Sequence, residues 1–355
     1  MKHVGTQMIK TKRLTLRRFE TSDADKMFTN WASDIEVTRY MRWQPYESVD
    51  GVKTMLDEWI GSYKNDNYYH WAICPDEGEP IGSVGVYIAS EHDHRAGLGY
   101  CIGRNWWDKG YMSEAVKAVI DYMYTNTDVE RIEAYHAVEN PASGKVMQKA
   151  GMEREGLARS KFKSGVGTFE DSDEYGIVRE MWEVQKEIDS YNSLPCTFND
   201  FIDVPELSDD VIHLVCLQKL HGNPEEKRKP VYMFAIYKDC EKIGEINLRI
   251  GYGGGPYNSN LYYGGHIGYD VNEPFRGNGY AVHACRLLLP VAKAHGMTKL
   301  LITNNHTNKA SMRVCEKLGA RLIRTVRLPE WNDMYNEDHK YQNIYEWEII
   351  SPTSG

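Results

Sequence analysis

The sequence carries the same strand–turn–helix pattern twice, and this repetition constrains the fold more than any other feature. Residues 99–115 read GYCIGRNWWDKGYMSEA and residues 268–284 read GYDVNEPFRGNGYAVHA. Each turn is followed at matching spacing by an asparagine, a serine and a glycine, which are Asn140, Ser143 and Gly151 in the first copy and Asn308, Ser311 and Gly319 in the second. In a chain of 355 residues, copies offset by 168 or 169 positions predict two domains of one fold.

Each turn places a glycine between the end of an apolar strand and the start of an amphipathic helix. The first N–H groups of a helix have no partner within the helix, and the helix dipole places partial positive charge at the same end. Such a turn binds anions and suits a pyrophosphate. Glycine there is also explained by a backbone angle that only glycine tolerates. The repeated asparagine and serine downstream favour the functional interpretation.

Composition and charge indicate a globular chain. Hydrophobic residues make up 41% and charged residues 26% of the sequence. No apolar run approaches the roughly 18 residues of a membrane span, and the N-terminus has no signal-peptide core, so we expect a cytoplasmic protein with no membrane partner. A net charge of −9 argues against nucleic acid as a partner. Seven scattered cysteines without a CxxC pair predict reduced thiols and no metal site.

The expected domains are residues 1–182 and, after a linker, residues 183–355. In the first copy we expect a polar loop over residues 89–96. Strands are expected at 9–18, 70–73, 80–88, from Gly99, at 131–137 and in the final YGIVREMW; helices are expected at 21–31, 49–63, 113–124 and from Asn140.

The second copy repeats this pattern less regularly. We expect strands at residues 231–236, 242–250 and 342–350, a mixed linker over 183–200, and a flexible insertion, GYGGGPYNSN, at 251–260. Early hairpins followed by strand–helix–strand units predict a mixed α/β (α+β) fold.

These residues resemble a known family, the GNAT acetyltransferases. The first copy, with GYCIGRNWWDKGYMSEAVKAVIDY and then RIEAYHAVENPASGKVMQKAGMEREG, is similar to the branch that acetylates the N-termini of ribosomal proteins. FRGNGYA in the second copy fits the Arg/Gln-x-x-Gly-x-Gly/Ala turn of the superfamily. The resemblance implies two tandem GNAT domains, each with a mixed, partly splayed sheet flanked by helices, and acetyl-CoA as cosubstrate.

The resemblance also implies that acetyl-CoA lies where two neighbouring parallel strands splay apart. The strand ends would pair with the pantetheine arm, and the amides of the turn would hold the pyrophosphate. In the first copy the implied binding residues are Cys101, Ile102, Gly103, Asp108, Lys109, Gly110, Tyr111, Met112 and Ser113. In the second copy they are Asp270, Val271, Asn272, Arg276, Gly277, Asn278, Gly279, Tyr280 and Ala281.

The first turn departs from the superfamily pattern. Trp107 replaces the Arg/Gln, Asp108 replaces a glycine, and Met112 takes the position of a small residue. A carboxylate at Asp108 is unfavourable beside a phosphate unless it points away, although Lys109 could offset its charge. By its turn, the second copy is the better cofactor site.

Acetyl transfer requires a proton for the departing thiolate. Many relatives donate it from a tyrosine, but here that position holds Met147 or Cys315, which leaves Ser143 and Ser311 as the expected donors with Asn140 and Asn308 beside them. Either asparagine could instead only cap its helix.

A base is expected two residues before the Gly-Tyr pair, where relatives often carry glutamate. The second copy has His266 there, which could act near neutral pH or be a packing residue. The first copy has Gly97, so that its base would come from elsewhere. The candidates are Glu91, His92, Asp93 and His94 in the adjacent loop and Glu133 and His136 on the next strand.

We therefore expect an N-acetyltransferase that acts on a primary amine, either a small molecule or a peptide N-terminus, as a monomer or homodimer. An α-amino group loses its proton at a cost of about 1 kcal/mol at pH 7, whereas an aliphatic amine requires roughly 4 to 5 kcal/mol. The alternative is a CoA-binding regulatory or structural protein in which one or both copies are inactive. A dinucleotide-dependent dehydrogenase is disfavoured, because neither turn gives GxGxxG within a βαβ unit.

Overall fold

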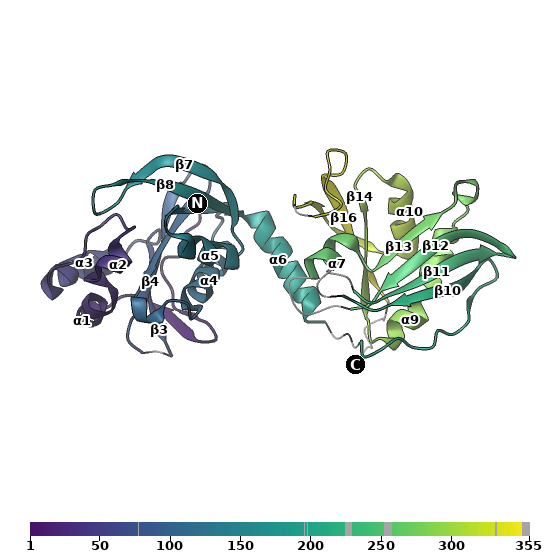
Figure 1. Cartoon of the computed structure of the whole chain (residues 1–355), viewed down its shortest axis with the longest axis horizontal. Coiled ribbons are helices and arrows are strands. Elements are labelled where there is room, and N and C mark those ends of the chain that lie inside the picture. The colour runs from purple at the N-terminus through teal and green to yellow at the C-terminus, as the bar shows by residue number, and fades with distance from the viewer. Residues whose placement is uncertain are drawn as a thin grey trace. The chain divides into compact units, whose positions relative to one another are not determined.

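The protein forms two compact units, Met1–Gln185 and Lys186–Gly355, each built on its own eight-stranded mixed sheet (Figure 1). The computed structural model describes residues 1–76, 78–194, 196, 198–223, 229–251, 258–330 and 332–349. This architecture confirms the predicted mixed α/β class. Among the described residues, no helix has the length and apolar character needed to cross a membrane.

The first sheet has the strand order β1-β2-β3-β4-β5-β6-β8-β7, and only β5 and β6 pair in parallel. Its strands are β1 Ile9–Lys10, β2 Leu14–Arg17, β3 Tyr69–Pro75, β4 Gly82–Ser90, β5 Arg95–Ile102, β6 Arg131–Ala137, β7 Glu153–Lys163 and β8 Phe169–Val178. Its helices are α1 Ala24–Met27, a π-helical turn Phe28–Ala32, α2 Ile35–Thr38, α3 Val49–Ser62, α4 Tyr111–Asn126 and α5 Pro141–Lys149; α6, Arg179–Asn192, follows β8.

Alternation along β3 explains how helices cover both faces of this sheet. Trp71 and Ile73 pack into one core cluster with α4, whereas Ala72 and Cys74 pack into another with α1 and α3. Successive side chains of a strand point to opposite faces, so α4 lies on one face and α1 and α3 lie on the other.

The second sheet has the order β15-β16-β14-β13-β12-β11-β10-β9, with one parallel pair, β13 and β14. Its strands are β9 Leu207–Ser208, β10 His213–Leu220, β11 Val231–Lys238, β12 Glu241–Arg249, β13 Ile267–Val271, β14 Lys299–Asn305, β15 Arg321–Arg327 and β16 Tyr341–Glu348. Its helices are α7 Asn258–Gly264, α8 Tyr280–Leu287, α9 Leu289–Ala294 and α10 Lys309–Leu318.

In each unit the parallel pair of strands splays apart. β5 and β6 pair from Arg95↔Arg131 to Gly97↔Glu133 only, although β5 continues to Ile102. β13 and β14 pair at Ile267↔Ile302 alone. Beyond these points one edge of β5 and of β13 faces a gap within the sheet. We call these openings the strand gaps.

Several predicted elements were wrong. The strand expected over residues 9–18 is a hairpin, because Thr11 N donates to Leu14 O and β1 turns back onto β2. The loop expected over 89–96 is shorter, because Arg95 and Ala96 already pair with β6. The strand expected in YGIVREMW ends at Val178, where α6 begins and continues into the predicted linker. Of the predicted insertion at 251–260, residues 252–257 lie outside the described residues and the end belongs to α7.

Candidate functional site

Both glycine turns have the geometry of an anion site. Gly110 and Gly279 are the N-caps of α4 and α8, with left-handed φ angles of 77° and 84°, and neither helix has a side-chain cap. Within the described residues, no acceptor is recorded for the backbone N–H groups of residues 108–113 and 277–281. A row of free N–H groups at the positive end of a helix is suited to a pyrophosphate.

Side chains in the first turns of these helices point into the protein. On α4 the side chain of Met112 is buried, whereas Tyr111 and Ser113 are half-buried. On α8 both Tyr280 and Ala281 are buried. These residues can therefore present backbone N–H groups to a ligand while their side chains anchor the helix.

Asp108 keeps the left-handed backbone of the second turn but differs from it in residue type and charge. Its φ is 57° where Gly277 has 86°, and a left-handed angle is uncommon for residues other than glycine, with asparagine and aspartate tolerating it best. Asp108 is exposed. The Lys109 amino group donates to the Asn105 carbonyl at 2.7 Å, and no ion pair with Asp108 is recorded in the described structure. Compensation of the Asp108 charge by Lys109 stays a prediction.

In the first unit Trp107 makes the hydrogen bond that Arg276 makes in the second unit. The indole N–H of Trp107 donates to Ile102 O at 2.9 Å, and Arg276 Nε donates to Val271 O at 2.7 Å. Ile102 and Val271 are the last residues of the equivalent strands β5 and β13. Tryptophan thus preserves the turn, although the guanidinium is missing.

Arg13 brings a cation to the first turn, which the motif comparison missed. Its guanidinium donates to Lys109 O at 2.9 Å, pairs with Glu114 at 2.6 Å and lies over the ring of Tyr111. Glu114 lies on α4 and also accepts from Thr11. The alternating run around Arg13 indicated only a strand, so the sequence carried no signal for this contact.

The strand ends expected to pair with pantetheine lie on the strand gaps. Gly103 N donates to Ile81 O and Asn272 N donates to Ile243 O, so one edge of each strand end is bonded to the neighbouring antiparallel strand region. The other edge of Cys101 and Ile102 faces the first strand gap, because the pairing of β5 with β6 has ended at Gly97. Asp270 is exposed and pairs with Arg276 at 3.3 Å. Asn278 holds the turn by donating to Phe275 O at 3.1 Å.

Each candidate serine is hydrogen-bonded to a tyrosine that sequence reasoning did not select. Tyr100 Oη lies 2.9 Å from Ser143 Oγ, and Tyr269 Oη lies 2.8 Å from Ser311 Oγ. Both tyrosines belong to the Gly-Tyr pair on the cofactor strand, so their repetition was the available signal. Met147 and Cys315 are fully buried, in agreement with a purely structural role for that position.

The two candidate asparagines differ. Asn308 Oδ1 accepts from Ser311 N at 3.1 Å and caps α10, whereas Asn140 makes no side-chain cap at α5. The side chain of Asn308 is therefore engaged by its own helix, whereas no hydrogen bond of the Asn140 side chain is recorded among the described residues.

The candidate bases in the loop before β5 are too far from the first strand gap. Glu91 binds the N-terminal ammonium and His3, His92 and Asp93 bind each other, and His94 contacts Asp128 O. All four precede Arg95, and an extended chain rises roughly 20 Å from His94 to Tyr100. The first strand gap therefore has no base among Glu91, His92, Asp93 and His94, which corrects the expectation for this loop.

Two candidates remain at the first strand gap. Glu133 is the last residue paired with β5 and lies between Arg95 and Arg131, at 3.6 and 3.5 Å. His136 is buried, and its Nε2 has no hydrogen-bond partner in the described part of the chain. A Cβ at Gly144 would come within 2.5 Å of that nitrogen, so α5 packs directly on the imidazole. At Gly97 a Cβ would overlap the ring of Tyr87, which therefore fills the place of the usual carboxylate.

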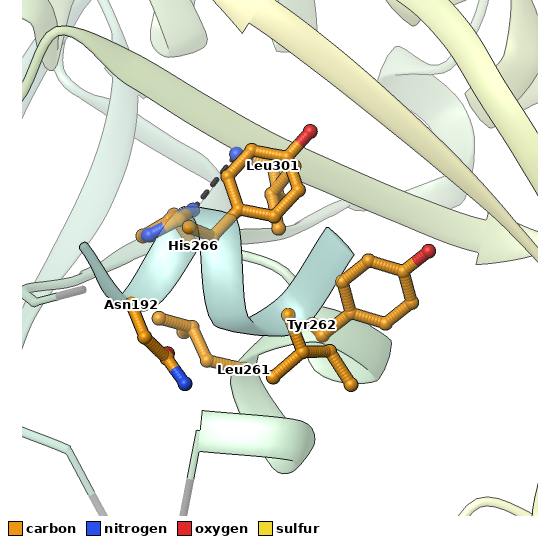
Figure 2. A pocket seen from close by; sticks show the side chains of 7 residues that line it. Asn192, Leu261, Tyr262, His266 and Leu301 are labelled. Atoms are coloured by element: carbon orange, nitrogen blue, oxygen red, sulfur yellow. Dashed lines mark hydrogen bonds between the residues drawn. The ribbon is translucent and has the colours of Figure 1, made fainter. Parts of the chain in front are cut away.

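His266 is a core residue and not a suitable base. Its ring is fully buried, and Nδ1 accepts from Leu301 N at 2.8 Å (Figure 2). Nδ1 must be unprotonated to accept this bond, so Nε2 carries the proton of the neutral ring. Burial, reinforced by Arg249, lowers the pKa of His266 to about 3. Burial and the bond from Leu301 therefore favour packing over catalysis for His266, contrary to the expectation that it is a base.

We expect His266 to make the second unit less stable in acid. Folded His266 stays neutral to about pH 3, whereas an unfolded histidine takes up a proton below about pH 6.5. Its contribution is complete above pH 6.5 and falls as the pH drops toward 3, by about 1.4 kcal/mol between pH 7.5 and 5.5. Hydrogen exchange of β14 peptides reports the free energy of unfolding at both pH values. In His266→Gln, whose side-chain amide oxygen can still accept from Leu301 N, the drop between pH 7.5 and 5.5 should be smaller by about 1.4 kcal/mol. An equal loss in both proteins would contradict the assignment.

Comparisons with known proteins give the following matches. The model described as "Acetyltransferase (GNAT) domain" matches residues 13–153 and 205–321. The uncharacterized N-acetyltransferase p20 of Bacillus licheniformis is 38% identical over 43% of this chain and 86% of that relative. The ribosomal protein uS5-alanine N-acetyltransferase of Escherichia coli is 37% identical over 26% of this chain and 48% of that relative. The solved structure of a GNAT-family acetyltransferase from Bacillus anthracis is 26% identical over 49% of this chain and 99% of that chain, with a TM-score of 0.43.

Proposed function

We propose a specific reaction from the premise that this chain belongs to the GNAT acetyltransferase family, whose model covers more than half of it in two segments. In this proposal the chain transfers acetyl from acetyl-CoA to a primary amine, with a peptide α-amino group as the preferred acceptor. The observation that carries it is a turn of free N–H groups beside a strand gap with a serine hydroxyl on α5 or α10, present in both units.

The proposed step is direct transfer. The neutral amine nitrogen bonds to the carbonyl carbon of the thioester, and the bond from that carbon to sulfur breaks. Ser143 or Ser311 gives its Oγ proton to the departing sulfur, and the proton released by the nitrogen returns to Oγ through water. General acid catalysis of this kind contributes about 10² to 10⁴ in rate.

The proposed preference for α-amino groups rests on the two positions where relatives carry glutamate, neither of which presents a base to a ligand in the described structure. Tyr87 covers Gly97 in the first unit, and His266 in the second is buried with Nδ1 already bonded. An acceptor of pKa near 7.7 costs about 1 kcal/mol to deprotonate at pH 7 and needs little help from a base. Glu133 or His136 would serve as the base of the first unit if an aliphatic amine were acetylated. The similarity to an enzyme named for the alanine of a ribosomal protein supports the same preference.

Thiol release from acetyl-CoA with a panel of amines tests this proposal. At pH 7 we expect an alanyl peptide to react at least tenfold faster than propylamine or a polyamine, because the free energies of deprotonation differ by about 3 to 4 kcal/mol. CoA bound without acceptor-dependent thiol release would instead identify the chain as a CoA-binding regulatory or structural protein. Faster reaction of the aliphatic amines would overturn the acceptor class while leaving acetyl transfer intact.

A further inference from the structure

The same tyrosine–serine hydrogen bond occurs in both units at equivalent positions. Tyr100 lies on β5 and Ser143 in the first turn of α5, whereas Tyr269 lies on β13 and Ser311 in the first turn of α10. The flanking sequences differ, with Cys-Ile-Gly after Tyr100 and Asp-Val-Asn after Tyr269. Two dissimilar copies of one fold thus keep the same pair of hydroxyls together.

This hydrogen bond spans the strand gap of each unit. Tyr100 is three residues beyond Gly97, where β5 parts from β6, and α5 is the helix that follows β6. Tyr269 is two residues beyond Ile267, where β13 parts from β14, and α10 follows β14. The phenol therefore connects the two sides of the opening into which the thioester must reach.

The backbone N–H of each serine is hydrogen-bonded, which fixes the backbone. The direction of the hydroxyl hydrogen is then set by the partners of Oγ. Ser143 N donates to Asn140 O, and Ser311 N donates to Asn308 Oδ1, both at 3.1 Å. Burial raises the pKa of Tyr100 and of Tyr269 above the ordinary value of a phenol, so both remain protonated donors. A serine oxygen that accepts from a phenol keeps its own hydrogen for another acceptor.

We propose that Tyr100 and Tyr269 are positioning residues, which donate to Ser143 Oγ and Ser311 Oγ and so direct each serine hydrogen into the strand gap, toward the thioester sulfur. This inference rests on the proposed function, in which serine protonates that sulfur. It adds a residue that contacts the serine Oγ and acts on the thioester only through it.

The two units should depend on their tyrosines to different degrees. Tyr100 Oη lies 2.9 Å from the carbonyl oxygen of Ser143 as well as from Oγ, whereas for Tyr269 only the contact with Oγ is recorded among the described residues. A phenol has one proton, which the carbonyl of Ser143 shares in the first unit. The second unit should therefore lose more when its tyrosine hydroxyl is removed.

Tyr100→Phe and Tyr269→Phe test the proposal in the full chain. Tyr100→Phe is combined with Gly279→Val, and Tyr269→Phe is combined with Gly110→Val. The glycine substitution blocks the turn of the other unit, so that the rate reports one unit. We expect Tyr269→Phe to lower kcat about tenfold at unchanged KM for acetyl-CoA, as for one lost hydrogen bond in the transition state. Tyr100→Phe should lower it less. In Ser311→Ala or Ser143→Ala chains the same substitutions should have no further effect.

Controls and a second readout keep the outcome decisive. Tyr122→Phe and Tyr191→Phe each remove a phenol hydrogen bond elsewhere, to Gly5 O and to Glu346, and should leave kcat unchanged. The ultraviolet absorbance of the thiolate of bound CoA should show its thiol pKa rising by about one unit in Tyr269→Phe. Three results for Tyr269→Phe would overturn the positioning role. They are a kcat within twofold of the controls, an equal loss of kcat in the Ser311→Ala chain, and an unshifted thiol pKa of bound CoA. Absence of acetyl transfer would overturn only the proposed function, because the thiol titration needs no acceptor.

Discussion

Gly279→Val is expected to weaken acetyl-CoA binding to the second unit about 100-fold. Gly279 is the N-cap of α8 with a φ of 84°, and a β-branched residue pays about 1 to 3 kcal/mol there or moves the turn. Relief of this strain moves the turn and misaligns the free N–H groups of residues 277–281, and a loss of 2.7 kcal/mol corresponds to about 100-fold in Kd. A Cβ at Gly279 would meet no protein atom within 4 Å, so the fold should survive.

Isothermal titration calorimetry with acetyl-CoA measures this loss, and Gly319→Val is its matched control. Gly319 has a φ of 77° at the C-cap of α10, and a Cβ there also meets no atom within 4 Å. The control therefore carries similar backbone strain away from the turn and should retain its affinity. Unchanged affinity of Gly279→Val at the second unit would remove the turn from the cofactor site.

Replacing both serines, Ser143→Ala with Ser311→Ala, is expected to lower kcat by 100-fold or more. The substitutions remove the proposed proton donors to the departing thiolate, and general acid catalysis is typically responsible for about 10² to 10⁴ in rate. Acetyl-CoA affinity should change little, because in the proposed site the turns and not the serines hold the pyrophosphate. Steady-state kinetics of thiol release, with Kd from calorimetry, separates the two effects.

The single serine variants show which unit catalyses. If Ser311→Ala alone removes most of the activity, the second unit is the principal site; if Ser143→Ala does so, the first unit is. Ser311→Thr and Ser143→Thr keep a hydroxyl and should restore part of the rate. A double alanine variant with the rate of the unsubstituted chain would reduce both serines to packing residues.

Local sequence predicted the parts of the site that depend on backbone geometry. Left-handed angles at Gly110 and Gly279 follow from glycine between a strand and a helix, and the strand at 131–137 and the helix from Asn140 lie where the pattern placed them. Such features arise from steric limits and hydrogen bonds among near neighbours in the chain, so a single sequence with an internal repeat is enough to find them.

Side-chain partners distant in sequence could not be predicted in this way. Arg13 reaches Lys109, and Tyr87 covers Gly97, only because of the order and register in which the strands and helices pack. The same local pattern also left open whether His266 is a base or a core residue. Its surroundings, with Leu301 N as donor, decided this.

The sequence by itself determined that the chain is a duplicated GNAT fold with two glycine turns and a serine after each. The tertiary structure alone decided that each serine is hydrogen-bonded to a tyrosine across the strand gap and that His266 is buried. It also decided that Trp107 makes in the first unit the strand-end hydrogen bond that Arg276 makes in the second. The physical reason is that spacing fixes the conformation of adjacent residues, whereas burial and the partners of a hydroxyl or imidazole depend on which elements fold against one another.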